Sequence, residues 1–161
     1  MTDIHHQPEQ TDDELYRHFF SRGGSLRLLA DIQGEDLESL YGYAKQLFDG
    51  GEIAAARNVY QLLSTLDHWN FDYLLALGLC HQRLGAHNEA VVCFGRAGLI
   101  KVDDPRAAFY AGISYRLDGN AEYASKAFKA AINWCGEQID YQAIKASAVD
   151  MLALQQEEVP C

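Results

Sequence analysis

Four columns of residues recur every 34 positions in this chain of 161 residues. Two columns hold only alanine or glycine, one holds only aromatic residues, and one holds only glycine. In chain order the columns are Ala44, Gly78 and Gly112; Ala56, Ala90 and Ala124; Tyr60, Phe94 and Phe128; and Gly51, Gly85 and Gly119. This spacing constrains the fold more than any other feature of the sequence, because every copy must form the same unit.

The period of 34 and the small and aromatic columns are typical of the tetratricopeptide repeat, which is a pair of antiparallel helices. Small residues are needed where two helices cross at about 8–10 Å, and the aromatic column fills the gap to the next repeat. The glycine column marks the turn inside each pair, since glycine adopts left-handed conformations without a steric cost. We therefore predict an all-α superhelix of three helix pairs, without a β-sheet, and we assign these columns to the scaffold.

Apolar residues at helical spacing place the boundaries of the elements. Helices are expected near 37–48, 52–65, 71–83, 87–100, 105–117, 121–134 and 138–157. We divide the chain into a disordered tail (1–10), an N-terminal helical segment (11–36), three repeats (37–136) and a C-terminal capping helix with its tail (137–161). The sequence does not decide whether 11–31 forms one kinked helix or two.

Function is expected in residues that the scaffold does not need. On the first helix of each repeat, the residues that follow the packing columns point about 100° away, toward the concave face. Most are large and apolar, which predicts a groove for an apolar peptide segment. These residues are Tyr41, Lys45, Phe48, Leu75, Leu79, Gln82, Phe109, Ile113 and Arg116. The alternative is that they are ordinary core residues, an interpretation that suits Leu75 best.

Another groove of this fold binds a C-terminal carboxylate through lysine, asparagine and arginine side chains. The corresponding positions here are mainly Tyr41, Lys45, Ala76, Arg106 and Tyr110. Lys45 and Arg106 are basic, but the asparagines are missing and aromatic residues replace the main clamp residues. A carboxylate clamp is therefore not expected.

Composition and motifs exclude several classes of function. A formal net charge of −10 argues against a nucleic acid or an anionic membrane as partner. No apolar run approaches the ~18 residues of a membrane span, and the polar N-terminus lacks the features of a signal peptide, so a cytosolic protein is expected. Phosphate-binding and nucleophile motifs are missing, and the four cysteines have no ligand spacing. We expect no enzyme activity, no cofactor and no metal.

Longer phrases of the sequence are more specific than the repeat pattern. They are GGSL at 23–26, LESLYGYAKQLFDGGEIAAARNVYQLLSTLDHWNFDYLLALGLCHQ at 37–82, and DPR at 104–106. In these phrases the chain resembles the class II chaperones of bacterial type III secretion, which hold hydrophobic translocator proteins before export. The resemblance covers about residues 15–136.

The resemblance implies that a concave groove binds an extended N-terminal segment of a translocator. It places a groove tyrosine at Tyr41 and two further groove aromatics at Phe48 and Ile53, where this chain departs from the usual tyrosines. Two rival functions remain open: a chaperone for needle or filament subunits, whose client would bind as a helix, and a generic repeat adaptor. The sequence names no client.

The N-terminal segment generates a first prediction. Its apolar residues Leu15, Phe19 and Phe20 exceed what a polar cap needs, and the resemblance also implies homodimers formed by N-terminal helices. We expect a weak homodimer that is lost when residues 1–31 are deleted, as measured by sedimentation of both chains. A full-length chain that stays monomeric at high concentration would contradict this prediction.

Overall fold

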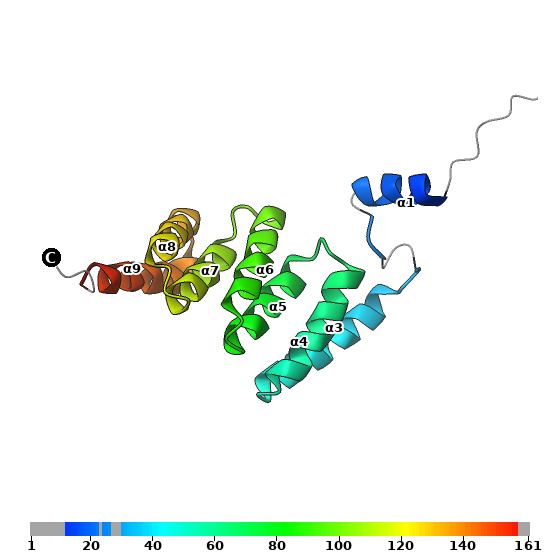
Figure 1. Cartoon of the computed structure of the whole chain (residues 1–161), viewed down its shortest axis with the longest axis horizontal. Coiled ribbons are helices and arrows are strands. Elements are labelled where there is room, and N and C mark those ends of the chain that lie inside the picture. Colours follow the sequence, from blue (N-terminus) through cyan, green and yellow to red (C-terminus); the bar gives the residue numbers. More distant parts are fainter. Residues whose placement is uncertain (1–11, 23, 27–29, 158–161) are drawn as a thin grey trace, which may run out of the picture.

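The computed structural model describes residues 12–22, 24–26 and 30–157, and within these ranges all regular structure is helical. Successive helices stack side by side into an elongated row, and helix α1 lies beyond one end of that row (Figure 1). The helices are α1 (Asp12–Ser21), α3 (Gly34–Asp49), α4 (Ile53–Leu66), α5 (Phe71–Arg83), α6 (His87–Ile100), α7 (Pro105–Leu117), α8 (Ala121–Cys135) and α9 (Gln142–Glu157). None of the described helices is both long and apolar enough to cross a membrane.

The helix boundaries follow from local chemistry. The side chains of Asn70, Asp104 and Asn120 cap α5, α7 and α8, each accepting a hydrogen bond from a main-chain N–H of the first turn. Pro105 occupies the start of α7, where its missing N–H costs nothing. Inside each pair, the turn glycine has a positive φ, as at Gly85 with 76°. The three pairs are thus α3–α4, α5–α6 and α7–α8, which confirms the predicted repeats.

The close packing of the columns is visible at the second and third repeats. A methyl group added at Gly78 would lie 2.5 Å from the ring of Phe94, and one added at Gly112 would lie 2.7 Å from the ring of Phe128. Both rings are buried. The small and aromatic columns therefore recur together because each ring lies directly against the backbone of the preceding helix.

The two ends differ in detail from the expected boundaries. Helix α3 begins at Gly34, three positions earlier than predicted. Leu37 and the preceding Ile32 pack with Ala44, Ala56 and Tyr60 in the first core cluster. The last helix was expected to run from 138 to 157. A 3₁₀ turn (Ile139–Tyr141) precedes α9 instead, after a left-handed Gly136. The expected disordered tail at 1–10 lies outside the described residues.

The glycines generate a second prediction. Gly78→Ala should lower the free energy of unfolding by about 1–3 kcal/mol, because the new methyl group overpacks against Phe94. Gly95, on the exposed side of α6, has no atom within 4 Å of an added methyl group, so Gly95→Ala should raise it by about 0.5–1 kcal/mol. Urea unfolding of both variants measures the difference. Equal effects at the two positions would contradict the proposed ring contact.

Candidate functional site

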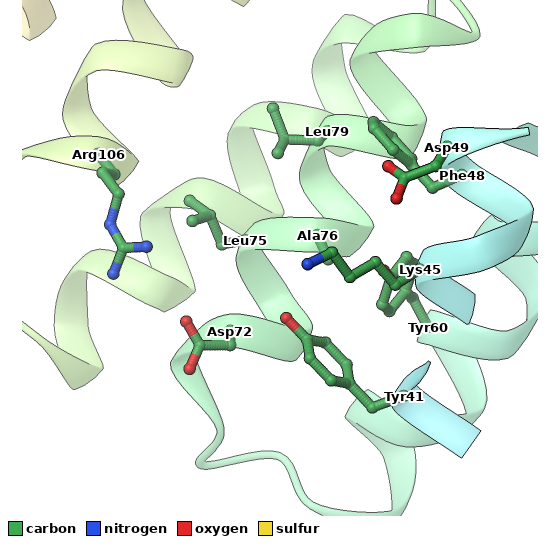
Figure 2. A pocket seen from close by; sticks show the side chains of 10 residues that line it. All are labelled: Tyr41, Lys45, Phe48, Asp49, Tyr60, Asp72, Leu75, Ala76, Leu79 and Arg106. Carbon is green, nitrogen blue, oxygen red and sulfur yellow. The ribbon is translucent and has the colours of Figure 1, made fainter. Parts of the chain in front are cut away.

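A hollow of about 230 Å³ lies between the first helices of the three repeats. Figure 2 shows side chains of α3 on one side, side chains of α5 across the middle, and Arg106 of α7 on the far side. Its lining residues are Tyr41, Lys45, Phe48, Asp49, Tyr60, Asp72, Leu75, Ala76, Leu79 and Arg106. The hollow is thus an apolar surface with charged residues around it.

The apolar surface is built on the aromatic core of the first repeat. The ring of Tyr41 packs against Tyr60 and Tyr73, with ring centroids 5.9 and 5.4 Å apart. Burial is the main reason why the pKa of Tyr41 is raised, and the negative charge of Asp72 raises it further. Phe48 lies under the guanidinium of Arg83 at 5.2 Å from the ring centroid. Tyr41 and Phe48 are only half-buried, so a ligand can still cover part of each side chain.

Arg106 is held in place at the α7 side. Its Nε lies 3.0 Å from Asp104 Oδ1 and its Nη2 lies 2.7 Å from Asp104 Oδ2. Its guanidinium also stacks 4.9 Å from the ring centroid of Phe71. Burial alone would raise the pKa of Asp104, but hydrogen bonds from Arg106 and its positive charge outweigh burial and lower that pKa. The arrangement fixes an arginine at the edge of an apolar hollow.

Half of the ten residues expected to bind a client line this hollow. They are Tyr41, Lys45, Phe48, Leu75 and Leu79. Leu75 is 7% exposed, so it contributes to the hollow mainly as a core residue. Ile53 packs against the first core cluster, as Tyr41 and Phe48 do, but it is not among the residues that line the hollow.

The four remaining residues lie elsewhere. Gln82 Nε2 donates to the main-chain oxygen of Tyr110 at 3.0 Å and to Ser114 Oγ at 2.8 Å, which ties α5 to α7. Phe109 and Ile113 belong to the C-terminal core cluster, together with Ile144 and Leu152 of α9.

Arg116 also faces the last helix, since its Nη1 lies 3.1 Å from Met151 Sδ. Phe109 is 9% exposed and is a core residue, whereas Ile113 and Arg116 are half-buried. None of the three lines this hollow, and their part in client binding stays a prediction.

Several lining residues were not predicted as site residues. Tyr60 was assigned to the scaffold alone, and Arg106 was considered only as a clamp position. Asp72 precedes Leu75 and Leu79 by three and seven positions, so the same helical periodicity places it on the same face of α5. The prediction covered only three columns of positions, at 41/75/109, 45/79/113 and 48/82/116, and Asp72 and Asp49 lie outside these columns.

Other sequence predictions fall partly within the described residues. Cys80, Cys93 and Cys135 are free and buried, as expected of small apolar residues, and burial raises the pKa of Cys80 to about 11. Among the described residues, no three histidine, cysteine, aspartate or glutamate side chains form a potential metal site. The half-buried Phe19 ring folds against Gly24, whereas the side chains of Leu15 and Phe20 lie outside those described.

Comparison with known proteins agrees with this architecture. The tetratricopeptide repeat family profile matches residues 37–70. The chain is 26% identical over 150 residues to the low calcium response locus protein H of Yersinia pestis, covering 91% of this chain and 89% of that protein. It is 25% identical to the type III secretion translocator chaperone SycD of Yersinia enterocolitica, whose structure superposes with a TM-score of 0.78 over 82% of this chain and 98% of SycD.

A third relative was solved with a bound peptide. PcrH of Pseudomonas aeruginosa, in complex with the chaperone binding region of PopD, is 28% identical, with a TM-score of 0.76 over 78% of this chain and 95% of PcrH. This chain is a homologue of the class II type III secretion chaperones. The resemblance stated from the sequence is confirmed, and the members of this family are chaperones.

The Asp104–Arg106 pair of this chaperone homologue generates a third prediction. In Asp104→Asn the amide can still cap α7 but carries no charge, so we expect the free energy of unfolding at pH 7 to fall by about 1–3 kcal/mol. The folded-state pKa of Asp104 is lowered, so the pair's contribution is complete above the unfolded pKa of about 4 and is lost as pH falls through the folded value.

Unfolding curves at several pH values measure this effect. The difference between the wild-type chain and Asp104→Asn should shrink as the pH drops below about 4. The exposed Asp103 is the matched control, and Asp103→Asn should follow the wild-type chain. A difference that stays constant down to strongly acidic pH would contradict a charge contribution of Asp104.

Proposed function

We propose that this protein is a cytosolic chaperone of a bacterial type III secretion system. It binds a segment of a hydrophobic translocator protein at the hollow between α3, α5 and α7. The bound translocator is kept from aggregation and from degradation, and it stays competent for secretion. The observation that carries the proposal is the half-exposed apolar surface at this hollow, in a homologue of PcrH, which was solved with the chaperone binding region of PopD.

The chemistry of the hollow suits this task. Tyr41, Phe48 and Leu79 are half-buried, and covering a large apolar side chain completely contributes about 1.5–3 kcal/mol. Micromolar affinity corresponds to about 8 kcal/mol after the costs of association, so these three contacts supply only part of it and further contacts along the client segment must supply the rest. From the third repeat this hollow takes Arg106, whereas Phe109 and Ile113 belong to the C-terminal core cluster.

The electrostatics of the chain also suit a carrier. A translocator exposes membrane-active apolar segments, and these aggregate in water. A carrier with a net charge of −10 repels other copies of itself and stays dispersed while its apolar surface is covered. The chaperone needs no catalytic residue, no cofactor and no metal for this role, since apolar burial drives the binding.

The two rival functions differ in the client. A needle or filament chaperone would bind a helix, whose main-chain groups are already hydrogen-bonded to one another. A generic adaptor would bind a partner that is not membrane-active. Identifying the protein that co-purifies from the native host distinguishes the three functions.

The hollow generates a fourth prediction. Tyr41→Ala and Phe48→Ala should each weaken client binding more than tenfold, because buried aromatic anchors commonly contribute at least about 2 kcal/mol. Both variants should keep most of their stability, since these side chains are only half-buried. Phe94→Ala is the control, and it should lower the free energy of unfolding by about 3–5 kcal/mol. Tyr60 is a poorer control because it also lines the hollow.

Each variant is measured twice, by a thermal melt and by co-purification with a co-expressed translocator. If Tyr41→Ala and Phe48→Ala melt like Phe94→Ala, the residues are core and the groove interpretation is wrong. If they melt normally and still retain the client fully, the client binds at another surface.

A further inference from the structure

An extended client segment has a requirement that apolar contacts alone do not meet. Its main-chain N–H and C=O groups lose water when the segment is buried, and each unpaired group costs about 1–3 kcal/mol. The walls of the hollow are helices, and beyond their first turns the main-chain N–H groups are hydrogen-bonded within each helix. Side chains that line the hollow are therefore the main source of partners for the client's main chain.

Arg106 offers a donor that needs little ordering when a ligand binds. Asp104 occupies its Nε and Nη2, and the stack on Phe71 fixes the plane of the guanidinium. Its Nη1 has no hydrogen-bond partner in the part of the chain that the structure describes. A side chain that is already fixed loses little rotamer entropy in forming one more hydrogen bond.

Asp72 offers an acceptor beside this donor. Asn70, rather than Asp72, caps α5. No hydrogen bond or ion pair joins the Asp72 carboxylate to another described residue, although its charge raises the pKa of both Tyr41 and Arg106. Figure 2 shows the carboxylate between the Arg106 guanidinium and the Tyr41 hydroxyl. A donor on α7 and an acceptor on α5 thus both line the hollow.

We propose that Arg106 and Asp72 bind the main chain of an extended client segment. Arg106 donates to a client C=O, and Asp72 accepts from a client N–H. In an extended chain both groups point sideways from the strand, and an unpaired edge presents them to whatever lies alongside. This inference rests on the proposed function and adds the residues that select an extended segment over a helix.

The surrounding charges favour a neutral main-chain group over a client carboxylate. The charge of Arg106 is already balanced by Asp104, at 2.7 Å. A client carboxylate at Arg106 would also lie near Asp72 and be repelled by it. A peptide carbonyl carries no net charge, so it gains the hydrogen bond without this repulsion.

The experiment uses the full chain and a fluorescein-labelled peptide of the chaperone binding region of PopD, with affinity measured by fluorescence anisotropy. Arg106→Gln should weaken binding about tenfold, and Arg106→Lys should weaken it nearly as much, because an ammonium group lacks the planar fork that Asp104 holds. Asp72→Ala should weaken binding about fivefold. Asp72→Asn should restore most of the affinity, because its amide oxygen still accepts a hydrogen bond.

Ester substitution in the peptide tests the main-chain contacts directly. Replacing one amide at a time by an ester removes the N–H and weakens the carbonyl as an acceptor. At one peptide position the ester should weaken binding to the wild-type chain but leave binding to Asp72→Ala unchanged. At a nearby position the ester should weaken binding to the wild-type chain but leave binding to Arg106→Gln unchanged. Wild-type affinity should change less than about threefold between roughly 50 and 500 mM salt, since no new ion pair forms.

Several outcomes would overturn the inference. Asp103→Ala is the control for an exposed carboxylate outside the hollow, and a loss equal to that of Asp72→Ala would make the effect a general one of charge. If Asp72→Ala and Arg106→Gln bind the peptide as tightly as the wild-type chain while Tyr41→Ala does not bind it, the client binds in the hollow without these main-chain contacts. A peptide that does not bind the wild-type chain at all would contradict the proposed function itself. Melting curves are recorded for every variant. If Arg106→Gln unfolds, the variants Asp72→Ala and Asp72→Asn decide the result, because Asp72 is exposed and its replacement does not disturb the core.

Discussion

The packing of an aromatic ring against the backbone of the preceding helix, at a glycine, sets the geometry of this protein. The ring of Phe94 lies over Gly78, and the ring of Phe128 lies over Gly112. Each contact fixes the rotation of the first helix of a repeat about its own axis. On α5, turning Gly78 toward α6 turns Asp72, Leu75 and Leu79 toward the hollow, because these positions lie about 60–120° around the helix from Gly78. The binding surface is therefore a consequence of the scaffold contact.

The end of the array decides how far this surface extends. A repeat array must cover the apolar side of its last unit, and α9 does so with Ile144, Ala148 and Leu152. Phe109 is buried in the same cluster as Ala148 and Ile113 packs against that cluster, and both occupy the same repeat positions as groove residues of the earlier units. Equivalent positions in a repeat therefore have different roles, depending on which helix packs over them.

These two features explain what the sequence could and could not predict. Helix boundaries follow from local signals such as Asn70, Pro105 and Gly85, and the helices from α4 to α8 were placed within one residue at each end. The site on α3 and α5 was predicted from helical periodicity. Phe109 does not line the hollow because it is buried in one cluster with Ala148 of α9, a tertiary contact that periodicity does not encode. Asp72 was missed because the prediction covered only the positions that follow the packing columns, and Asp72 lies about one turn before the first of these positions, Leu75.

The lining side chains differ in how much of each is exposed, and this shows where binding a ligand can bury further apolar surface. Leu75 is 7% exposed and Tyr60 is 3% exposed, so a ligand can remove little more of either side chain from water. The half-exposed Tyr41 and Phe48 lie on α3, the first helix of the row of repeats (Figure 1). Apolar affinity therefore arises mainly on the α3 side. The α7 side presents Arg106, which is fixed by Asp104 and has little apolar surface to offer. A segment that crosses the hollow thus meets two half-exposed aromatic side chains on the α3 side, where Lys45 and Asp49 also line the hollow, and the fixed Arg106 on the α7 side.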